Sequence, residues 1–293
     1  MSQSTSMTKL FLFLFFGLIG ISFASVLIKL CAAPALTIAF YRLFIATIFY
    51  TLLAKLKRPT LETRPLKSKM LLSGLFLALH FITWITSLQY TSVISSVVLV
   101  QSSPLFTAIA SALILKELPA RKTMIGLGFG IIGMVGMALI DLNQTGSNLM
   151  GNGLALAGAI FAAAYLTIGR SIRAHMDTIN YVKWVYGSAA GCVFVTSLFT
   201  STSLTGFTPH TWLILMAIAI GPQIVGHTSL NYALKHLTAV TVSLFTLAEP
   251  LGASLLAFFL LGERPSLLKI VFGVIILYGI ALAILGEKRN IEQ

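Results

Sequence analysis

The second half of this 293-residue chain repeats part of the first half without a gap. The two stretches cover residues 91–119 and 237–265, and in this alignment Pro104 falls on Pro250. Three further pairs then coincide: Glu117 with Glu263, Pro119 with Pro265, and Gly133 with Gly279. A repeat unit that crosses a membrane an odd number of times returns in the opposite orientation, which is typical of secondary transporters. The repeat therefore predicts two halves of inverted topology.

The composition places both halves in a membrane. Apolar residues make up 57% of the chain and charged residues 10%, and the mean hydropathy is +0.94, whereas soluble proteins carry about a quarter charged residues. Segments long enough to cross about 30 Å of hydrocarbon occur ten times, at 9–30, 34–54, 68–88, 92–115, 121–140, 149–170, 181–200, 210–232, 237–261 and 266–286. We therefore expect an all-α integral membrane protein with ten transmembrane helices in an inverted five-plus-five repeat. A polar stretch near 141–153 divides residues 1–145 from residues 146–293.

The positive charges indicate how this bundle is oriented. The formal net charge is +12, which on its own could suggest binding to nucleic acid. With the N-terminus in the cytoplasm, however, fifteen Lys and Arg residues lie on the inner side, against Lys29, Arg264 and Lys269 on the outer side. This asymmetry follows the positive-inside rule and predicts a cytoplasmic-membrane protein with both termini in the cytoplasm. The basic stretch 55–69 is then a loop that faces anionic lipid, and no nucleic-acid partner is expected.

Several common enzyme and metal motifs are missing from the sequence. It contains neither the G-x-x-x-x-G-K-[ST] loop that binds ATP nor the H-E-x-x-H pair of a metalloprotease. Cys31 and Cys192 form no C-x-x-C and belong to different halves. We expect no cofactor, no metal and no enzymatic activity. The first apolar segment could also be a signal peptide, but the five spans of the second half require a matching helix here, so we expect it to be retained.

Three runs of residues resemble the signatures of a transporter family. His80–Phe106 (HFITWITSLQYTSVISSVVLVQSSPLF) is similar to the first-half signature of the EamA family in the drug/metabolite transporter superfamily. Ala233–Ala253 (ALKHLTAVTVSLFTLAEPLGA), followed by Leu260–Glu263 (LLGE), is similar to its second-half signature, and Ala39–Leu43 (AFYRL) to its second-span motif. The resemblance implies ten helices in an inverted repeat and the export or exchange of small metabolites, often amino acids. It also implies a cavity among helices 1, 3, 4, 6, 8 and 9, with the fifth and tenth helices outside as scaffold or dimer surface.

Two charged residues, Glu249 and Arg42, lie deep within the predicted spans, at least eight residues from either end. Glu249 is near the middle of the ninth span, where an uncompensated carboxylate costs about 2.5–3.5 kcal/mol, so it should face the bundle interior. It could carry a proton or pair with a substrate ammonium; the alternative is a plain hydrogen bond to a neighbouring helix. Arg42, in the second span, could be its charge partner, could bind a substrate carboxylate, or could tie two helices together.

Two pairs of residues in the third and eighth spans carry side chains that could contact a substrate. His80 and Trp84, and likewise His227 and Asn231, are four residues apart, so each pair shares one face of the third or eighth span. A histidine in the middle of a membrane can donate, accept or titrate near neutral pH, and a tryptophan offers a wall to apolar or cationic cargo. We expect all four to bind substrate, with a buried structural hydrogen bond as the alternative for the histidines.

Five more candidates for substrate binding come from four different spans. Ser22 and Phe23 end a small-residue stretch of the first span, and Tyr165 follows another in the sixth, where a ring could line or gate the path. Gln101 in the fourth span is long enough to reach a cavity. Gln223 ends a Gly-Pro-Gln run that interrupts the eighth span, and interrupted helices are typical of transporter binding regions.

The sequence therefore predicts a secondary transporter that moves a small metabolite by alternating access, with an amino acid or a related amphipathic compound favoured and export preferred. One alternative is uptake or exchange of a larger metabolite, such as S-adenosylmethionine or a nucleotide-like compound. Another is a membrane sensor or assembly subunit without turnover. The expected partners are a small-molecule substrate and the lipid bilayer, and the chain is expected to be a monomer or a homodimer.

Overall fold

The computed structural model describes residues 7–56, 65–141, 148–252, 255–256 and 266–291, and these residues form helices joined by short turns and loops. In chain order the helices are α1 (Met7–Ser22), α2 (Ala24–Leu30), α3 (Ala35–Lys55), α4 (Pro65–Tyr90), α5 (Val93–Val100), α6 (Ser103–Ala110), η1 (Ser111–Leu115), α7 (Arg121–Asp141), α8 (Leu149–Arg173), α9 (Thr178–Phe199), α10 (Pro209–Ile218), η2 (Ala219–His227), α11 (Thr228–Ala233), α12 (Ala239–Thr246) and α14 (Leu267–Ile291). The predicted all-α fold is confirmed. Glu263, Arg264, Pro265 and the loop residues 57–64, named above, lie outside the described residues.

The helices agree with the predicted membrane spans. Eight helical segments of the described chain are long and apolar enough to cross a membrane, and three of them combine shorter pieces: α1 with α2, α5 with α6 and η1, and α10 with η2 and α11. α7, with 21 residues, and the shorter apolar helix Ala239–Gly252 stand where the fifth and ninth spans are predicted. A helix satisfies its own backbone hydrogen bonds, which is what hydrocarbon demands of a spanning segment.

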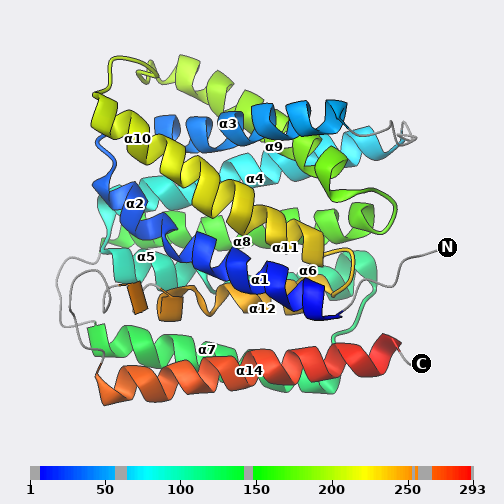
Figure 1. The fold of residues 1–293 in the computed structure, drawn as a ribbon. Coiled ribbons are helices and arrows are strands. Elements are labelled where there is room, and N and C mark those ends of the chain that lie inside the picture. The colour runs from blue at the N-terminus through cyan, green and yellow to red at the C-terminus, as the bar shows by residue number, and fades with distance from the viewer. Residues whose placement is uncertain (1–6, 57–64, 142–147, 253–254, 257–265, 292–293) are drawn as a thin grey trace.

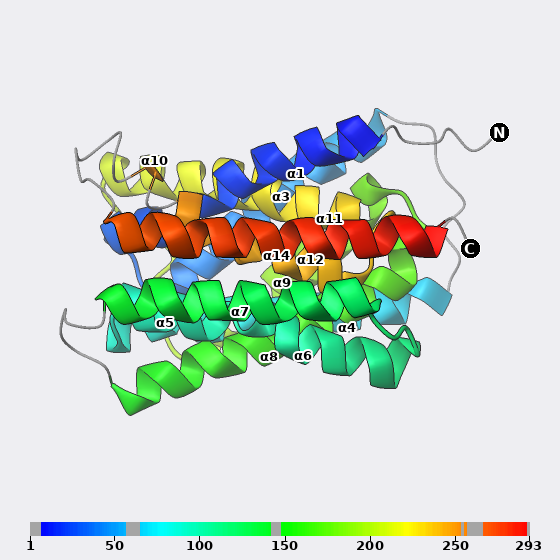
Figure 2. The same ribbon diagram turned by 90° about the horizontal axis from the view of Figure 1, so that it is seen from below.

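α7 and α14 form an antiparallel pair along one edge of the bundle (Figures 1 and 2). Gly126 and Gly279 meet where the two helices touch, because a Cβ on Gly279 would come within 2.5 Å of the Gly126 carbonyl oxygen. Closer to the C-terminal end of α14, Gly286 faces Thr123 of α7. From the first contact to the second, residue numbers rise along α14 and fall along α7, so the two helices are antiparallel. These helices close the two predicted repeats, and their opposite directions are those of an inverted repeat.

The other helices pack on the inner side of this pair, with α3 and α9 at the opposite edge of the bundle (Figure 1). α4 packs on α8 between them, and α1 packs on η2. One core of buried apolar residues joins α1–α4 to α8–α11. A second core, which includes Leu244 of α12, Leu247 just after that helix and Ile276 of α14, holds the α7–α14 pair against the rest of the bundle. The start of α1 and the end of α14 lie at the same end of the bundle (Figure 2), as an even number of spans requires.

The fourth and ninth spans are interrupted at equivalent positions of the repeat. Each begins with a hydroxyl cap, because the side chains of Ser92 and Thr238 accept hydrogen bonds from backbone N–H groups three residues later. In the fourth span, Ser102 N–H donates to Leu99 O and Leu105 N–H to Ser102 O. In the ninth span, the bonds from Ala248 N–H to Phe245 O and from Leu251 N–H to Ala248 O repeat this pattern.

A proline explains both interruptions. Pro104 and Pro250 have no N–H and cannot continue the ladder of bonds four residues apart, so the backbone tightens to bonds three residues apart. The turn in each span immediately precedes one of two equivalent residues of the repeat, Ser103 in the fourth span and Glu249 in the ninth. The prolines of the repeat thus place two non-helical turns deep inside the bundle.

The first and eighth spans also depart from a regular α-helix. α1 ends at Ser22 and α2 starts at Ala24, with Phe23 between them. The eighth span was expected to be interrupted at Pro222, and the departure takes the form of a π-helix, η2, that contains this proline. π-Helical turns are rare and occur frequently at functional sites. Both departures lie side by side, because α1 packs on η2.

Candidate functional site

A cavity of about 60 Å³ lies in the middle of the bundle. It is surrounded by the interrupted first, fourth, eighth and ninth spans together with α4 and α8. Its wall consists of Ile21, Ala24, His80, Trp84, Val100, Gln101, Ser103, Ala162, Tyr165, Leu166, His227, Leu230, Thr246 and Glu249. The resemblance to the family implied a cavity among helices 1, 3, 4, 6, 8 and 9, and the residues that line this cavity come from these six helices.

His80 and Trp84 form one aromatic side of the cavity. Their rings stack at 5.8 Å between centroids with an interplanar angle of 14°, as expected for residues four apart on one helix. The Nδ1 atom of His80 lies 2.9 Å from the carbonyl oxygen of Gly158 on α8, so this histidine both lines the cavity and holds α4 against α8. The His227 ring completes the group at 6.4 Å from His80.

Glu249 and Gln101 meet in another part of the cavity wall. The Gln101 Nε2 atom donates a 2.6 Å hydrogen bond to Glu249 Oε2, which joins the interrupted turns of the fourth and ninth spans. Both side chains are nearly fully buried. The second carboxylate oxygen of Glu249, Oε1, has no hydrogen-bond partner among the described residues. The carboxylate is therefore held at one oxygen and available at the other.

Arg42 lies behind the aromatic wall. It is fully buried, its Nε donates a 2.9 Å hydrogen bond to Gln223 Oε1, and its guanidinium carbon lies 3.8 Å from the centroid of the Phe81 ring. Phe81 in turn contacts the His227 ring at 5.1 Å. A stacked guanidinium beside a carboxamide is well oriented, yet Nη1 and Nη2 have no hydrogen-bond partner among the described residues.

Unpaired polar atoms are concentrated in this part of the molecule. Besides the atoms of Arg42 and Glu249, they include Trp84 Nε1, Gln223 Nε2 and His227 Nδ1. An unpaired polar group in a dry interior costs about 1–3 kcal/mol, and more when it is charged. Such groups persist where water or a ligand satisfies them. The cluster therefore has the donors and acceptors of a binding site for a small polar molecule.

A series of hydrogen bonds leads from the cavity toward the end of the bundle where α8 ends and α9 begins. Tyr165, in the cavity wall, donates a 2.5 Å hydrogen bond to Asn231 Oδ1. Asn231 Nδ2 donates to the Tyr186 hydroxyl at 3.1 Å, and that hydroxyl lies 3.1 Å from Thr228 Oγ1. These bonds link α8, α9 and α11, so they close the cavity on this side.

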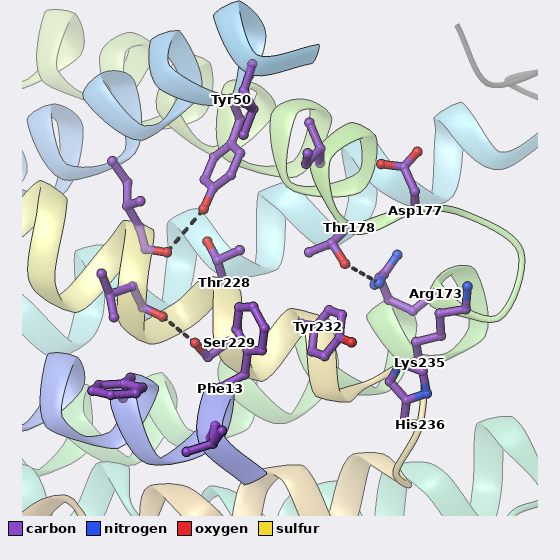
Figure 3. Close-up of a pocket in the computed structure, with 16 residues that line it drawn as sticks. Phe13, Tyr50, Arg173, Asp177, Thr178, Thr228, Ser229, Tyr232, Lys235 and His236 are labelled. Carbon is purple, nitrogen blue, oxygen red and sulfur yellow. Dashed lines mark hydrogen bonds between the residues drawn. The ribbon is translucent and has the colours of Figure 1, made fainter. Parts of the chain in front are cut away.

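Beyond Thr228 lies a larger crevice of about 840 Å³ (Figure 3). It is lined by α1, the end of α3, the end of α8, the start of α9, and η2 and α11. Figure 3 shows Phe13, Tyr50, Thr228 and Ser229 around one part of it, and the charged residues Arg173, Asp177 and Lys235 together at another part. The hydrogen-bonded series separates this crevice from the central cavity.

The structure places most of the candidate residues around the central cavity. His80, Trp84, Gln101, Tyr165, His227 and Glu249 line it. Gln223 and Asn231 lie one layer behind the wall, because they bond to Arg42 and Tyr165 respectively. Ser22 also lies outside the wall, since its hydroxyl bonds back to Leu18 O and its side chain packs where a Cβ on Gly252 would stand. Phe23 occupies the gap between α1 and α2, and its neighbours Ile21 and Ala24 line the cavity instead.

Three buried residues of this region were not identified from the sequence. Phe81 and Tyr186 are apolar or aromatic residues in long apolar helices, where nothing in the sequence distinguishes them from core residues. Arg173 lies just beyond the predicted sixth span, which ends at residue 170, and counts there only as one of the fifteen inner positive charges, but it is buried at the end of α8. Its guanidinium donates to Asn231 O, Met176 O and Thr178 Oγ1, and these bonds satisfy the charge where two helices meet.

Known proteins resemble this chain over most of its length. The sequence profile of the EamA-like transporter family matches residues 8–139 and 149–285. The chain is 25% identical over 213 residues to the uncharacterized transporter YyaM of Bacillus subtilis (strain 168), covering 71% of this chain and 68% of that protein. It is 23% identical over 271 residues to an uncharacterized transporter of Archaeoglobus fulgidus, covering 89% and 91%. A solved crystal structure shares the fold, with a TM-score of 0.76 at 18% identity over 96% of this chain and 98% of that chain.

Proposed function

Because the chain belongs to the EamA-like transporter family, we propose that it is a secondary transporter that exports a small zwitterionic metabolite, an amino acid or a close relative, across the cytoplasmic membrane. Membrane transport is the activity of the family and the description of the relatives. The zwitterionic substrate and the outward direction are our proposal.

One observation supports a zwitterion. A buried cation and a buried carboxylate lie near the same cavity, and each is held at one atom by a carboxamide from the other half of the chain: Arg42 by Gln223, and Glu249 by Gln101. The remaining charged atoms, Nη1 and Nη2 on one side and Oε1 on the other, are unpaired. A substrate carboxylate would pair with Arg42 and a substrate ammonium with Glu249, which would compensate both charges.

The rings between these charges suit the rest of such a substrate. His80, Trp84 and His227 form a wall that an apolar or aromatic side chain could contact, and Trp84 could also hold a cation over its face. Phe81 separates Arg42 from His227, so a carboxylate would reach the guanidinium after a small displacement of these rings. The proposed site therefore needs a change of shape on binding.

The size of the cavity supports alternating access. A volume of about 60 Å³ is far below the ~300–1,000 Å³ of typical small-molecule sites and is too little for an amino acid. The described state is then a closed one, and substrate enters when the two halves separate. The interrupted turns before Pro104 and Pro250 lie where such a motion would need flexible backbone.

Substrate-dependent flux in proteoliposomes tests this proposal. Vesicles loaded with a labelled amino acid should release it faster than vesicles without protein, and a panel of unlabelled amino acids should compete. Amines and carboxylic acids that carry a single charge should compete more weakly than zwitterions. Competition by S-adenosylmethionine or nucleotides but not by amino acids would contradict the substrate class, and no flux with any compound would favour a sensor or assembly role. The same assay with and without a pH gradient tests proton coupling.

A further inference from the structure

The wall of the crevice beyond Thr228 changes in character with depth. Lys235 and His236 lie in the turn just beyond α11, at the end of a membrane span, whereas Ile224 and Val225 lie within η2. At the α-helical rise of 1.5 Å per residue, the ten residues from Val225 to Lys235 span at most about 15 Å along the helix axis. This is about half of the ~30 Å hydrocarbon thickness. The crevice therefore extends through one leaflet, with charged residues at the headgroup level and apolar residues at the level of the acyl chains.

The apolar part of the crevice is open toward the side of the bundle. Phe13 and Phe16 of α1 line it and are 52% and 57% exposed, and Val225 is 38% exposed. In a membrane-spanning bundle these side chains face lipid. A wall of this kind is unfavourable for a water-filled vestibule, because water would cover apolar surface, but it matches a hydrocarbon chain.

The charged part of the crevice is electropositive. The Lys235 side chain is exposed and has no ion-pair partner among the described residues. Desolvation lowers the pKa of His236, and the nearby cations Lys235, Arg173 and Arg170 lower it further. Asp177 is the acid of this wall, but its carboxylate caps α9 by accepting bonds from the backbone and side-chain nitrogens of Asn180. Basic pockets between helices at a membrane surface bind anionic headgroups.

We propose that this crevice is a binding site for an anionic phospholipid of the adjacent leaflet, with the phosphate at Lys235 and His236 and an acyl chain between α1 and η2. The chain would lie against Ile224 and Val225, directly beside Thr228, where the hydrogen-bonded series from Tyr165 ends. A bound lipid would thus support the helices that close the central cavity on this side. The proposal concerns a site separate from the transported substrate and does not depend on its identity.

Lipid retention by the purified full-length protein tests the proposal. Protein is equilibrated with mixed micelles of phosphatidylglycerol and phosphatidylcholine that have the same acyl chains, and bound lipid is counted by native mass spectrometry. Wild type should retain phosphatidylglycerol in preference. Lys235→Gln should reduce this preference about five-fold, the effect of one basic residue near a membrane surface. The matched control is Lys122→Gln, which removes an exposed charge at the start of α7 outside the crevice and should leave the preference unchanged.

A second arm tests the acyl-chain part. Val225→Trp should fill the crevice and remove the retained lipid, whereas Ile132→Trp on the exposed face of α7 should not. Phe13→Ala, which removes part of the wall without adding volume, provides a further variant and should weaken retention. The His236 pKa, followed by NMR, should rise with phosphatidylglycerol and stay unchanged with phosphatidylcholine.

Three results would overturn the proposal. One is an equal lipid preference in Lys235→Gln and Lys122→Gln. Another is retention of phosphatidylglycerol by both Val225→Trp and Phe13→Ala. The third is displacement of the lipid by a transported amino acid or by inorganic phosphate, which would make the crevice an aqueous vestibule or a phosphate site instead.

Discussion

Gln101 and Glu249, which are 148 residues apart, share a 2.6 Å hydrogen bond in the middle of the bundle. Each stands at the interrupted turn of its span, and the two turns are related by the repeat. The bond therefore connects the two halves at the point where each half departs from a regular helix. It also leaves one carboxylate oxygen, Oε1, without a partner among the described residues. A proton or a substrate ammonium that binds at Oε1 could therefore change the strength of the Gln101–Glu249 hydrogen bond, which joins the two halves.

The first prediction concerns Glu249→Gln. The variant keeps a side-chain oxygen that can accept from Gln101, and Arg42 is bonded to Gln223 instead. We therefore expect the stability to change by less than about 1 kcal/mol, well below the 3–5 kcal/mol lost when a buried ion pair is broken. If Glu249 carries the coupling proton, the variant should exchange substrate but no longer respond to a pH gradient. Melting temperature and gradient-driven flux should be measured together.

The control is Glu117→Gln, which alters the carboxylate that pairs with Arg170 outside the cavity. It should retain the response to a pH gradient. A normal pH response in Glu249→Gln would remove Glu249 from coupling, and a large loss of stability would mean that it pairs with Arg42 in the dominant state.

The second prediction concerns Arg42→Lys. A lysine keeps the charge but loses the fork geometry that allows the Nε bond to Gln223 together with stacking on Phe81. We expect flux to fall about 10- to 100-fold, or ~1–3 kcal/mol. The variant should also discriminate less between an amino acid and its amide, which lacks the carboxylate. Arg121→Lys, an exposed change at the start of α7, is the matched control and should behave as wild type.

Third, the aromatic wall should contribute to affinity. His80→Ala and Trp84→Ala each remove a ring from the cavity, and the loss of one aromatic contact should weaken binding by about 1–3 kcal/mol, roughly ten- to a hundred-fold. Competition binding in detergent should show this while expression persists. Trp212→Ala removes a ring outside the cavity, beside Tyr41, and should leave affinity unchanged. Unchanged affinity in both wall variants would assign the pair to packing.

A fourth experiment addresses the hydrogen bonds that close the cavity. Asn231→Leu keeps the size of the side chain but leaves the Tyr165 hydroxyl without its acceptor and the Tyr186 hydroxyl with Thr228 alone. The cost should be about 1–3 kcal/mol, seen as a lower melting temperature. Thr196→Val removes a hydroxyl that bonds back to its own helix at Cys192 O and should cost less. Equal melting temperatures for the two variants would mean that water replaces Asn231 readily.

The fifth prediction is the topology. Single cysteines at Glu62→Cys and Gly146→Cys, introduced without Cys31 and Cys192, should react with a membrane-impermeant reagent from opposite sides. Position 62 should react from the cytoplasmic side, since the positive charges of the predicted topology lie there. Labelling of both positions from one side would require a different number of spans between them.

Much of this architecture follows from local sequence. Apolar length predicts the spans. The caps at Ser92 and Thr238 and the interruptions before Pro104 and Pro250 were not predicted, but they too are local, because caps and prolines act on their own backbone within a few residues. The gap-free repeat predicts that α7 and α14 run in opposite directions. Spacing along one helix also groups His80 with Trp84 on one face, as observed.

The pairing of polar groups across helices could not be obtained in this way. Glu249 bonds to Gln101 and not to Arg42, and Asn231 faces Tyr165 and Tyr186 behind the cavity wall. These contacts depend on the rotation and depth of one helix against another, which are set by packing of the whole bundle, including close approaches such as Gly126 with Gly279. Helical periodicity defines the face on which a residue lies, whereas the neighbour that this face meets is a property of the assembled helices.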